Sequence, residues 1–360
     1  MNEIRAKIGV PETSFTLVSQ DNYFQATNYN DVRTSIGKIN PPISIPVMHV
    51  TDDFVYASDI NKLRDSLNSV LTGHGIAEAW SFSTGSYSFS DFALDSLGNI
   101  YLTYYSDSSL LTGLRKFDSS GNELWVRYIN CRSITIDSSD NLYISGNNFI
   151  KKLDPNGNEI WTNSEINVRT ADIAIDSFDN VYVVHPYSST SLYKSIRKLD
   201  TNGNEVWFSS EDGFPFVVAI DTYSNILVGS NRSIKKLDPN GNEIWSISDI
   251  NFVCSVAIDL SGNVYIATRR SIIKTDTNGN EIWTINVRYS TENQIVADLS
   301  SNIYLNDGIQ LIHKFDSNGN EIWRKSFDYS NKKIAFDSLG TLYTAYEIYE
   351  RTSITKYIEY

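Results

Sequence analysis

The chain has 360 residues, of which 41% are hydrophobic and 20% are charged, so it can build an apolar core and lacks the composition of a disordered protein. Its 43 Asp and Glu residues outnumber its 30 Lys and Arg residues, and the net charge of -13 argues against a nucleic-acid partner. The first residues lack the apolar stretch of a signal peptide, and no apolar run reaches the length of a membrane-spanning helix. We therefore expect a folded protein that is made in a cytoplasm and does not insert into a membrane.

Residues 1–77 differ in kind from the rest and are predicted to form a separate N-terminal docking arm. They contain four of the eight prolines and no Trp. Ser58 suits a helix N-cap and Gly73 suits a helix stop, and between them runs a narrow apolar stripe of Ile60, Leu63, Leu67 and Val70. This pattern predicts one short helix over residues 58–72. Its stripe packs either on the rest of the chain or on another copy, which would make a homo-oligomer.

Residues 78–360 carry an internal repeat that is marked by tryptophan. The 7 Trp residues lie 36 to 46 positions apart, at Trp80, Trp125, Trp161, Trp207, Trp245, Trp283 and Trp323. A period near 40 residues in a chain rich in alternating apolar residues is typical of the blades of a β-propeller. We expect the Trp of each repeat to pack between neighbouring blades.

Each repeat contains two hairpins. The first is seen in IAIDSFDNVYVV at 173–184, and the second is IKKLDPNGNEIW, which occurs identically at 150–161 and 234–245. In the second, Asp, Pro, Asn and Gly follow in the order that a type I turn with a left-handed fourth residue requires. Each repeat therefore has four strands, here called a to d from the ring axis outward. The Lys two residues before the Asp, such as Lys152, is interpreted as part of a solvated strand face that pairs with the Glu of NGNE.

The two ends of the repeat region complete each other. Seven first hairpins have a turn aspartate, but only six second hairpins have a turn glycine. SITKYIEY at 353–360 stops where the missing turn is expected, and EAW at 78–80 is a strand d without a strand c. Pairing these two segments closes the ring and leaves no open sheet edges. The predicted fold is all-β: a seven-bladed β-propeller of four-stranded blades over 78–360, closed by N- and C-terminal strands and preceded by an extended arm with one short helix.

The repeats also carry a resemblance. AIDLSGNVYIA and FALDSLGNIYLTYYSDSS resemble bacterial β-propeller repeats with the consensus DSSGNVYVTG, and KLDPNGNEIW is similar to the PQQ-like repeat. Such repeats occur in enzymes, adhesins and scaffolds, so the resemblance implies the fold and no single function. The adjacent cysteine pair of quinoprotein dehydrogenases is absent, because Cys131 and Cys254 are far apart. These two residues are also expected to lie too far apart in the fold for a disulfide.

No catalytic or metal-binding motif stands out. HExxH, GxSxG and CxxC are all absent, and the four His residues are scattered. The DPNGN turns offer oxygens but have their Gly two positions too early for an EF-hand-type loop. We therefore expect no enzymatic activity, a PQQ-type enzyme included, with no catalytic residues, no cofactor and no metal.

Residues 50–71, VTDDFVYASDINKLRDSLNSVL, resemble linker helices that recur in bacteriophage tail fibre and baseplate proteins. This resemblance implies a virion surface protein that is assembled in the host cytoplasm. Its arm, residues 1–77, would contact other virion proteins, and its propeller would bind a host cell-surface glycan or protein. Two alternatives stay open: a structural or decorating virion protein without a ligand, and a bacterial adhesin or protein-binding scaffold.

The blade pattern also predicts which face binds. The near-identical a–b and c–d turns share one face, and the b–c turns and blade links, which vary in length and chemistry, share the other. On that variable face the phrases INCR (129–132), INVR (166–169) and INVR (285–288) each place an Arg at the entry to a strand a. We expect these arginines either to hold an anionic group of a ligand beside stacking aromatics or to pair with nearby carboxylates and carbonyls. The candidate ligand-binding residues are Arg132, Arg169, Arg288, Tyr128, Tyr187, Tyr193, Phe214, Arg232, Arg269 and Tyr289, and the same loops hold Phe252.

Overall fold

A computed structural model describes residues 24–25, 50–51, 54–55, 76–83, 88–105, 112–146, 148–164, 172–185, 195–210, 214–288, 290–327, 331–337, 340–348 and 351–359. The chain divides into two compact units, one of Met1–Ser81 with Thr355–Tyr360 and one of Phe82–Ile354. All the secondary-structure elements within the described ranges are β-strands. No helix among these residues has the length and apolar content that crossing a bilayer requires.

The first unit contains a small antiparallel sheet. Its strands are β1 (Phe24–Gln25), β2 (Val50–Thr51) and β3 (Phe54–Val55), in the order β1-β3-β2. Phe24 pairs with Val55 on one side of the central strand, and Val50 pairs with Val55 on the other. The helix predicted over residues 58–72 lies outside the described residues, so its existence and its partners stay predictions.

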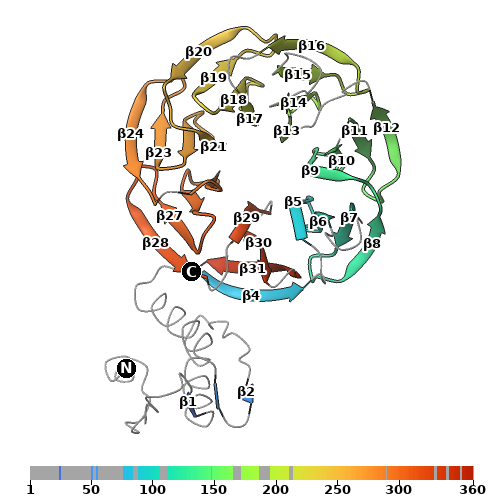
Figure 1. The fold of residues 1–360 in the computed structure, drawn as a ribbon, viewed down its shortest axis with the longest axis vertical. Coiled ribbons are helices and arrows are strands. Elements are labelled where there is room, and N and C mark those ends of the chain that lie inside the picture. The colour runs from blue at the N-terminus through green and yellow to red at the C-terminus, as the bar shows by residue number, and fades with distance from the viewer. Residues whose placement is uncertain are drawn as a thin grey trace. The chain divides into compact units, whose positions relative to one another are not determined.

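The propeller is confirmed. Its first three blades are the sheets β5 (Ser88–Leu94), β6 (Ile100–Tyr105), β7 (Thr112–Phe117), β8 (Glu123–Arg127); β9 (Cys131–Ile136), β10 (Leu142–Gly146), β11 (Ile150–Leu153), β12 (Glu159–Asn163); and β13 (Asp172–Ile175), β14 (Val181–His185), β15 (Ser195–Leu199), β16 (Glu205–Ser210). In each blade the strands follow one another in sequence order from the axis outward, as Figure 1 shows. Every described pairing between them is antiparallel.

The next three blades repeat this arrangement. They are β17 (Pro215–Ile220), β18 (Ile226–Ser230), β19 (Ser233–Leu237), β20 (Glu243–Ser248); β21 (Val253–Ile258), β22 (Val264–Thr268), β23 (Ser271–Thr275), β24 (Glu281–Asn286); and β25 (Gln294–Ala297), β26 (Ile303–Asn306), β27 (Leu311–Phe315), β28 (Glu321–Ser326). The seventh sheet has the order β29-β30-β31-β4, with β29 (Asn331–Phe336), β30 (Leu342–Ile348), β31 (Arg351–Glu359) and β4 (Ile76–Ser83). The predicted closure by N- and C-terminal strands is therefore confirmed.

The repeated turns form because their aspartates act as acceptors for the turn backbone. Asp154 Oδ1 accepts the N–H groups of Asn156 and Asn158 at 2.9 and 2.8 Å, and Oδ2 accepts Asn158 Nδ2 at 2.8 Å. Gly157 closes the turn with a φ of 80°, a left-handed conformation that favours glycine. The Asp154 carboxylate oxygens, which resemble ligands of a calcium loop, therefore accept hydrogen bonds within the turn.

Five of the lysines two residues before these aspartates are buried, namely Lys116, Lys152, Lys236, Lys274 and Lys314, which corrects the expectation of a solvated face. Lys236 is 4% exposed, and its Nζ lies 2.9 Å from Oδ2 of Asp221 in the first hairpin of the same blade. Lys152 pairs with Asp137 in the same way, at 3.1 Å. The strand alternation points these side chains inward, and the Glu of NGNE pairs instead with the residue before, as in Lys151–Glu159.

A tyrosine on strand b completes each such group in six blades. Its ring is fully buried in all six. In five of these blades a Lys Nζ lies 4.8 to 5.3 Å from the ring centre, as Lys274 does from that of Tyr265 at 5.0 Å. Burial is the main cause that raises the pKa of the Tyr265 hydroxyl, which bonds to Asp259 at 3.2 Å. The six tyrosines are Tyr101, Tyr143, Tyr182, Tyr265, Tyr304 and Tyr343; the fourth blade has Leu227 at this position. These ionisable groups are structural parts of the blade.

The tryptophans pack between blades, as predicted. Nε1 of Trp207 donates to the Pro239 carbonyl in the c–d turn of the next blade at 3.1 Å, and the ring lies against Gly241 of that turn. Lys198 Nζ donates to the same carbonyl at 3.0 Å. The a–b and c–d turns of the blades therefore lie on one face, here called the turn face, and are bonded to one another across blade boundaries. The opposite face, with the b–c turns and blade links, is called the variable face.

Candidate functional site

The strongest candidate site is the central cavity of the propeller, with a volume of about 590 Å³. All seven inner strands, β5, β9, β13, β17, β21, β25 and β29, contribute to its lining. Its charged residues are three carboxylates and two cations: Asp91, Asp172, Glu292, Arg132 and Lys333. The volume and the mixed polar lining suit a ligand of small-molecule size.

Seven of the lining residues occupy one equivalent position, four residues before the turn aspartate of each blade. We call this set the inner ring: Asp91, Ser133, Asp172, Val217, Ser255, Gln294 and Lys333. Several members bond to the next blade through its backbone. Ser255 Oγ accepts the N–H of Ile295 at 3.2 Å, and Gln294 Oε1 accepts the N–H of Ile334 at 2.7 Å. The inner ring therefore joins neighbouring blades at the axis.

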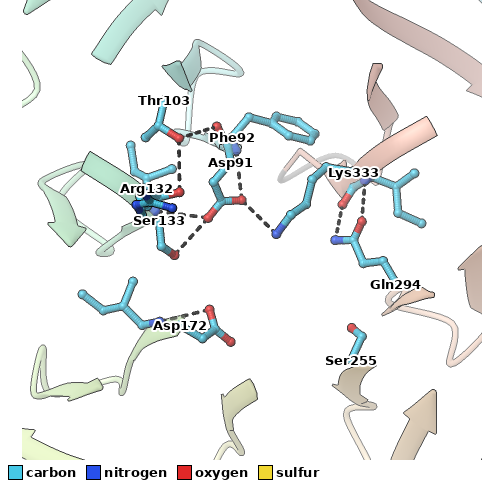
Figure 2. Close-up of polar contacts among 12 residues, drawn as sticks. Asp91, Phe92, Thr103, Arg132, Ser133, Asp172, Ser255, Gln294 and Lys333 are labelled. Atoms are coloured by element: carbon cyan, nitrogen blue, oxygen red, sulfur yellow. Dashed lines mark hydrogen bonds and ion pairs between the residues drawn. The ribbon is translucent and has the colours of Figure 1, made fainter. Parts of the chain in front are cut away.

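Asp91 is the most fully bonded member of the inner ring. Its Oδ2 accepts the Ser133 hydroxyl at 3.0 Å and the Ile134 N–H at 3.1 Å, and its Oδ1 lies 3.1 Å from Lys333 Nζ. Oδ1 also accepts the Phe92 N–H at 3.0 Å. Figure 2 shows these contacts converging on the carboxylate. The Asp91 charge is the main cause that raises the pKa of Lys333, so the Lys333 ammonium stays charged at neutral pH.

Asp172 has the equivalent place in the third blade but a poorer set of partners. Its Oδ2 accepts the Val218 N–H at 3.0 Å, and its Oδ1 accepts the Ile173 N–H at 3.0 Å. In the blade after Asp172 the inner-ring position holds Val217, which has no hydroxyl. In the blade after Asp91 the same position holds Ser133, whose hydroxyl bonds to Asp91. Loss of hydration inside the channel raises the pKa of Asp172 to about 6, although the Lys333 charge acts in the opposite direction. Figure 2 draws one of these hydrogen bonds of Asp172 beside the contacts of Asp91.

An aromatic stack lies on the variable face beside this cavity. The rings of Phe216 and Phe252 are 4.8 Å apart and inclined by 28°, and Phe214 stacks on Phe216 at 6.5 Å with an inclination of 27°. We call these three residues the phenylalanine ladder. Arg269 ends it, with its guanidinium carbon 4.0 Å from the centre of the Phe252 ring. Phe216 also lines the cavity, so the ladder runs from the loops into the channel.

The loops that carry the ladder are braced by their backbones. The Ile250 N–H in the link before β21 donates to the Arg232 carbonyl in a b–c turn at 3.1 Å. The Ser290 N–H in the next link donates to the Arg269 carbonyl at 3.0 Å. Bonds of this kind hold variable loops in one conformation and reduce the entropy that a ligand must overcome.

The structure brings together some of the residues predicted from sequence. Arg132 lines the cavity, and Phe214 and Arg269 belong to the ladder or its end. Three others, Tyr128, Arg232 and Arg288, are exposed and are not among the cavity-lining residues. The remaining four, Arg169, Tyr187, Tyr193 and Tyr289, lie outside the described residues. The three-arginine site of Arg132, Arg169 and Arg288 therefore stays a prediction.

Sequence reasoning missed the charged members of the inner ring and Phe216. A signal was present, because DFALD, DIAID and KIAFD place a charge four residues before the turn aspartate, where other blades have Ser, Val or Gln. The two cysteines are free thiols, as expected, and burial raises the pKa of Cys131 to about 12. In the part of the chain that the structure describes, no cluster of His, Cys, Asp or Glu is arranged to hold a metal ion.

No protein-family model and no curated protein sequence matches the chain. Solved structures are similar to it at the level of the fold. Virginiamycin B lyase from Staphylococcus aureus has a TM-score of 0.66 at 12% identity, covering 79% of this chain and 99% of that one. The Pan2 WD40 domain of Neurospora crassa has a TM-score of 0.63 at 10% identity, covering 78% of this chain and 95% of that one. BamB from Moraxella catarrhalis has a TM-score of 0.51 at 16% identity, covering 79% of this chain and 97% of that one. The chain is thus similar to β-propellers whose named roles differ.

Proposed function

We propose that the chain is a non-enzymatic binding protein of a virion surface and that the variable face of its propeller binds a host cell-surface glycan. The observation that carries the binding role is the phenylalanine ladder at the cavity, capped by Arg269. Half-buried aromatic faces with polar groups close by are the usual means of holding a ligand that is apolar on one face and polar at its edge. A pyranose ring has that character.

The ladder and the cavity together supply both kinds of contact. Phe216 gives an aromatic surface, and Arg132, Glu292 and Ser255 give charged or hydrogen-bonding side chains in the same cavity. The near-identical turns occupy the opposite face and use their polar groups among themselves. Binding by the variable face thus leaves the bonds that hold the blades together undisturbed.

The virion part of the proposal rests on the resemblance of residues 50–71 to tail fibre and baseplate linkers. Under this proposal residues 1–77 dock the chain to other virion proteins, the helix at 58–72 is available for contact with another copy, and assembly takes place in the host cytoplasm. Labelling the chain in purified particles tests this part independently of ligand binding. Its absence from every particle would overturn the virion location.

The binding part is tested with the full chain on bacterial cells and on a glycan array. We expect binding to surface glycan that is lost when Phe252 is changed to Ala and is retained in Phe178→Ala, which removes a turn-face ring that is 73% exposed. Equal loss in both variants would mean that the binding face is wrong. No binding to any cell or glycan would exclude the proposed role.

A second candidate is a protein-binding scaffold that uses the turn face. Large apolar side chains at the tips of five a–b turns are 64 to 77% exposed: Leu97, Phe178, Tyr223, Leu260 and Leu299. A ring of exposed apolar tips is typical of a protein-contact surface. Recovery of a protein partner that is lost in Tyr223→Ser, with no glycan binding, would favour this role.

A further inference from the structure

Asp91 and Asp172 hold equivalent positions in the inner ring, yet the Asp91 carboxylate has more hydrogen-bond and ion-pair partners than the Asp172 carboxylate. Asp91 receives three N–H or O–H groups and the ammonium of Lys333. The contacts of Asp172 are two backbone N–H groups, and among the described residues no Lys or Arg lies within ion-pair distance of it. A carboxylate inside a protein channel is strongly stabilised by a hydrogen-bonded cation, so Asp172 retains the capacity to bind one.

The surroundings of Asp172 favour a cation that arrives with a ligand. Phe216 lines the same cavity, and aromatic faces attract ammonium groups. Lys333 is held by Asp91 at 3.1 Å and retains an exposed fraction of 38% in its side chain, because it borders the open channel. Glu292, on the link before β25, adds a second acidic side chain to the lining. The anionic side chains of the cavity outnumber its cationic ones.

We propose that the glycan bound by the variable face carries a primary ammonium group, as a de-N-acetylated amino sugar does, and that Asp172 accepts its N–H bonds inside the cavity. This inference rests on the proposed glycan binding and names the class of glycan. The three-arginine site for an anionic group stays a separate prediction. The described part of the cavity lining has two cationic side chains, Arg132 and Lys333, and three carboxylates.

The charge of Asp172 depends on pH in the range where the proposal can be tested. The other charged or titratable groups that line the cavity are Asp91, Arg132, Cys254 and Lys333 on inner strands and Glu292 on the link before β25. Burial raises the pKa of Cys254 to about 11, so this thiol stays neutral, and Lys333 stays charged. Protonation of Asp172, whose pKa is about 6, is then a change in the cavity between pH 6.8 and pH 5.0 that weakens ammonium binding, although the amines of the ligand gain positive charge over the same range.

The experiment measures binding of two matched probes to the full chain by calorimetry at pH 6.8. One probe is the chitosan tetrasaccharide with free amines, and the other is the chitin tetrasaccharide, in which the amines are acetylated. We expect the free-amine probe to bind at least about tenfold more tightly, the typical effect of one charge-assisted hydrogen bond. Asp172→Asn, which keeps the acceptor for the Val218 N–H, should abolish this ratio, and lowering the pH to 5.0 should reduce it in the unaltered chain.

A charge-matched control separates a site from general attraction between a polycation and an acidic protein. Glu281→Gln removes one negative charge from an exposed position on outer strand β24 and should leave the ratio unchanged. Equal affinity for the two probes, or an equal effect of Asp172→Asn and Glu281→Gln, would overturn the proposal. If Asp172→Asn does not fold, an unchanged ratio at pH 5.0 overturns it instead. Cell binding that persists without any preference for free amines would reject the ammonium site and leave the glycan-binding function standing.

Discussion

The turn face and the variable face of the propeller are built from the same repeats but differ in what their side chains do. On the turn face an aspartate begins each turn and is bonded to the turn backbone, as Asp238 is to Asn240 and Asn242 at 2.9 Å. On the variable face the loops differ from blade to blade, and the phenylalanine ladder occurs at the fourth and fifth blades. The repetition thus marks turn residues that bond one blade to the next, and its interruptions on the variable face include the residues of the proposed ligand site.

The largest effect is expected from a turn-face residue that reaches into a blade. Asp221→Ala removes the carboxylate 2.9 Å from Lys236, which is 4% exposed, and leaves that ammonium unpaired. We expect a loss of about 3–5 kcal/mol in the free energy of unfolding, measured by urea denaturation. Asp238→Ala in the exposed c–d turn of the same blade is the control and should cost much less. Similar losses would contradict the distinction between buried and exposed turn aspartates.

A smaller effect is expected where a turn touches the next blade. Gly203 has a φ of 84°, and an added Cβ would lie 2.7 Å from Cε3 of Trp161 in the preceding blade. Gly203→Ala should therefore cost about 2 kcal/mol or more, from the left-handed backbone and the displaced ring together. Gly98→Ala is the control, because Gly98 has a φ of 74° and an added Cβ would have no atom nearer than 3.7 Å. This variant should show the cost of the left-handed backbone alone. Thermal denaturation of both variants measures the difference, and equal shifts would show that the Trp contact is loose.

Variants of the ladder should separate binding from stability. Phe252→Ala removes the ring that lies between Phe216 and Arg269. We expect the affinity for the glycan or cell surface to fall at least about tenfold, as for an aromatic anchor, with about 1 kcal/mol of lost stability because the ring is half-buried. An unfolded variant would instead mean that the ladder belongs to the core.

The smallest effect concerns pH. Hydrogen bonds from the Asn four residues later are the main cause that lowers the pKa of the exposed turn aspartates Asp118, Asp154, Asp238 and Asp276. Because their folded pKa lies below the unfolded one, their contribution to stability is complete above about pH 4 and is lost as the pH falls through the folded pKa.

Asp172 acts with the opposite sign in the same measurement. Its folded pKa of about 6 lies above the unfolded value, so its ionisation costs stability above pH 6 and that cost disappears on acidification. We expect the melting temperature at pH 5 to be no lower than at pH 7 and to fall below pH 4. In Asp172→Asn the gain between pH 7 and pH 5 should vanish. A melting temperature that drops steadily from pH 7 would contradict both assignments.

The fold was predictable because its signals repeat. Each turn needs Asp, Asn and Gly at fixed positions, and each blade needs its Trp, so one decoded repeat gave the strand order and the closure through residues near Trp80 and Ile354. The burial of Lys152 was not predictable, since a Lys in an alternating strand normally faces solvent and the pairing with Asp137 joins two hairpins of one blade. The cavity residues escaped prediction for a related reason. Asp91 and Lys333 meet across the ring closure, and proximity of residues that far apart in sequence follows only from the closed geometry.

The unequal inner ring also bears on how the chain selects a single arrangement while it folds. Blades that repeat the same twelve residues can pair in the wrong order, because the outer hairpins of one blade fit beside several others. At the axis the partners differ: Gln294 bonds to both the N–H and the carbonyl of Ile334, and Lys333 meets Asp91. A misordered ring would place Lys333 beside Val217 or Ser255 and leave its charge without a counterion. The inner ring therefore distinguishes one blade junction from another, which the nearly identical turns cannot do.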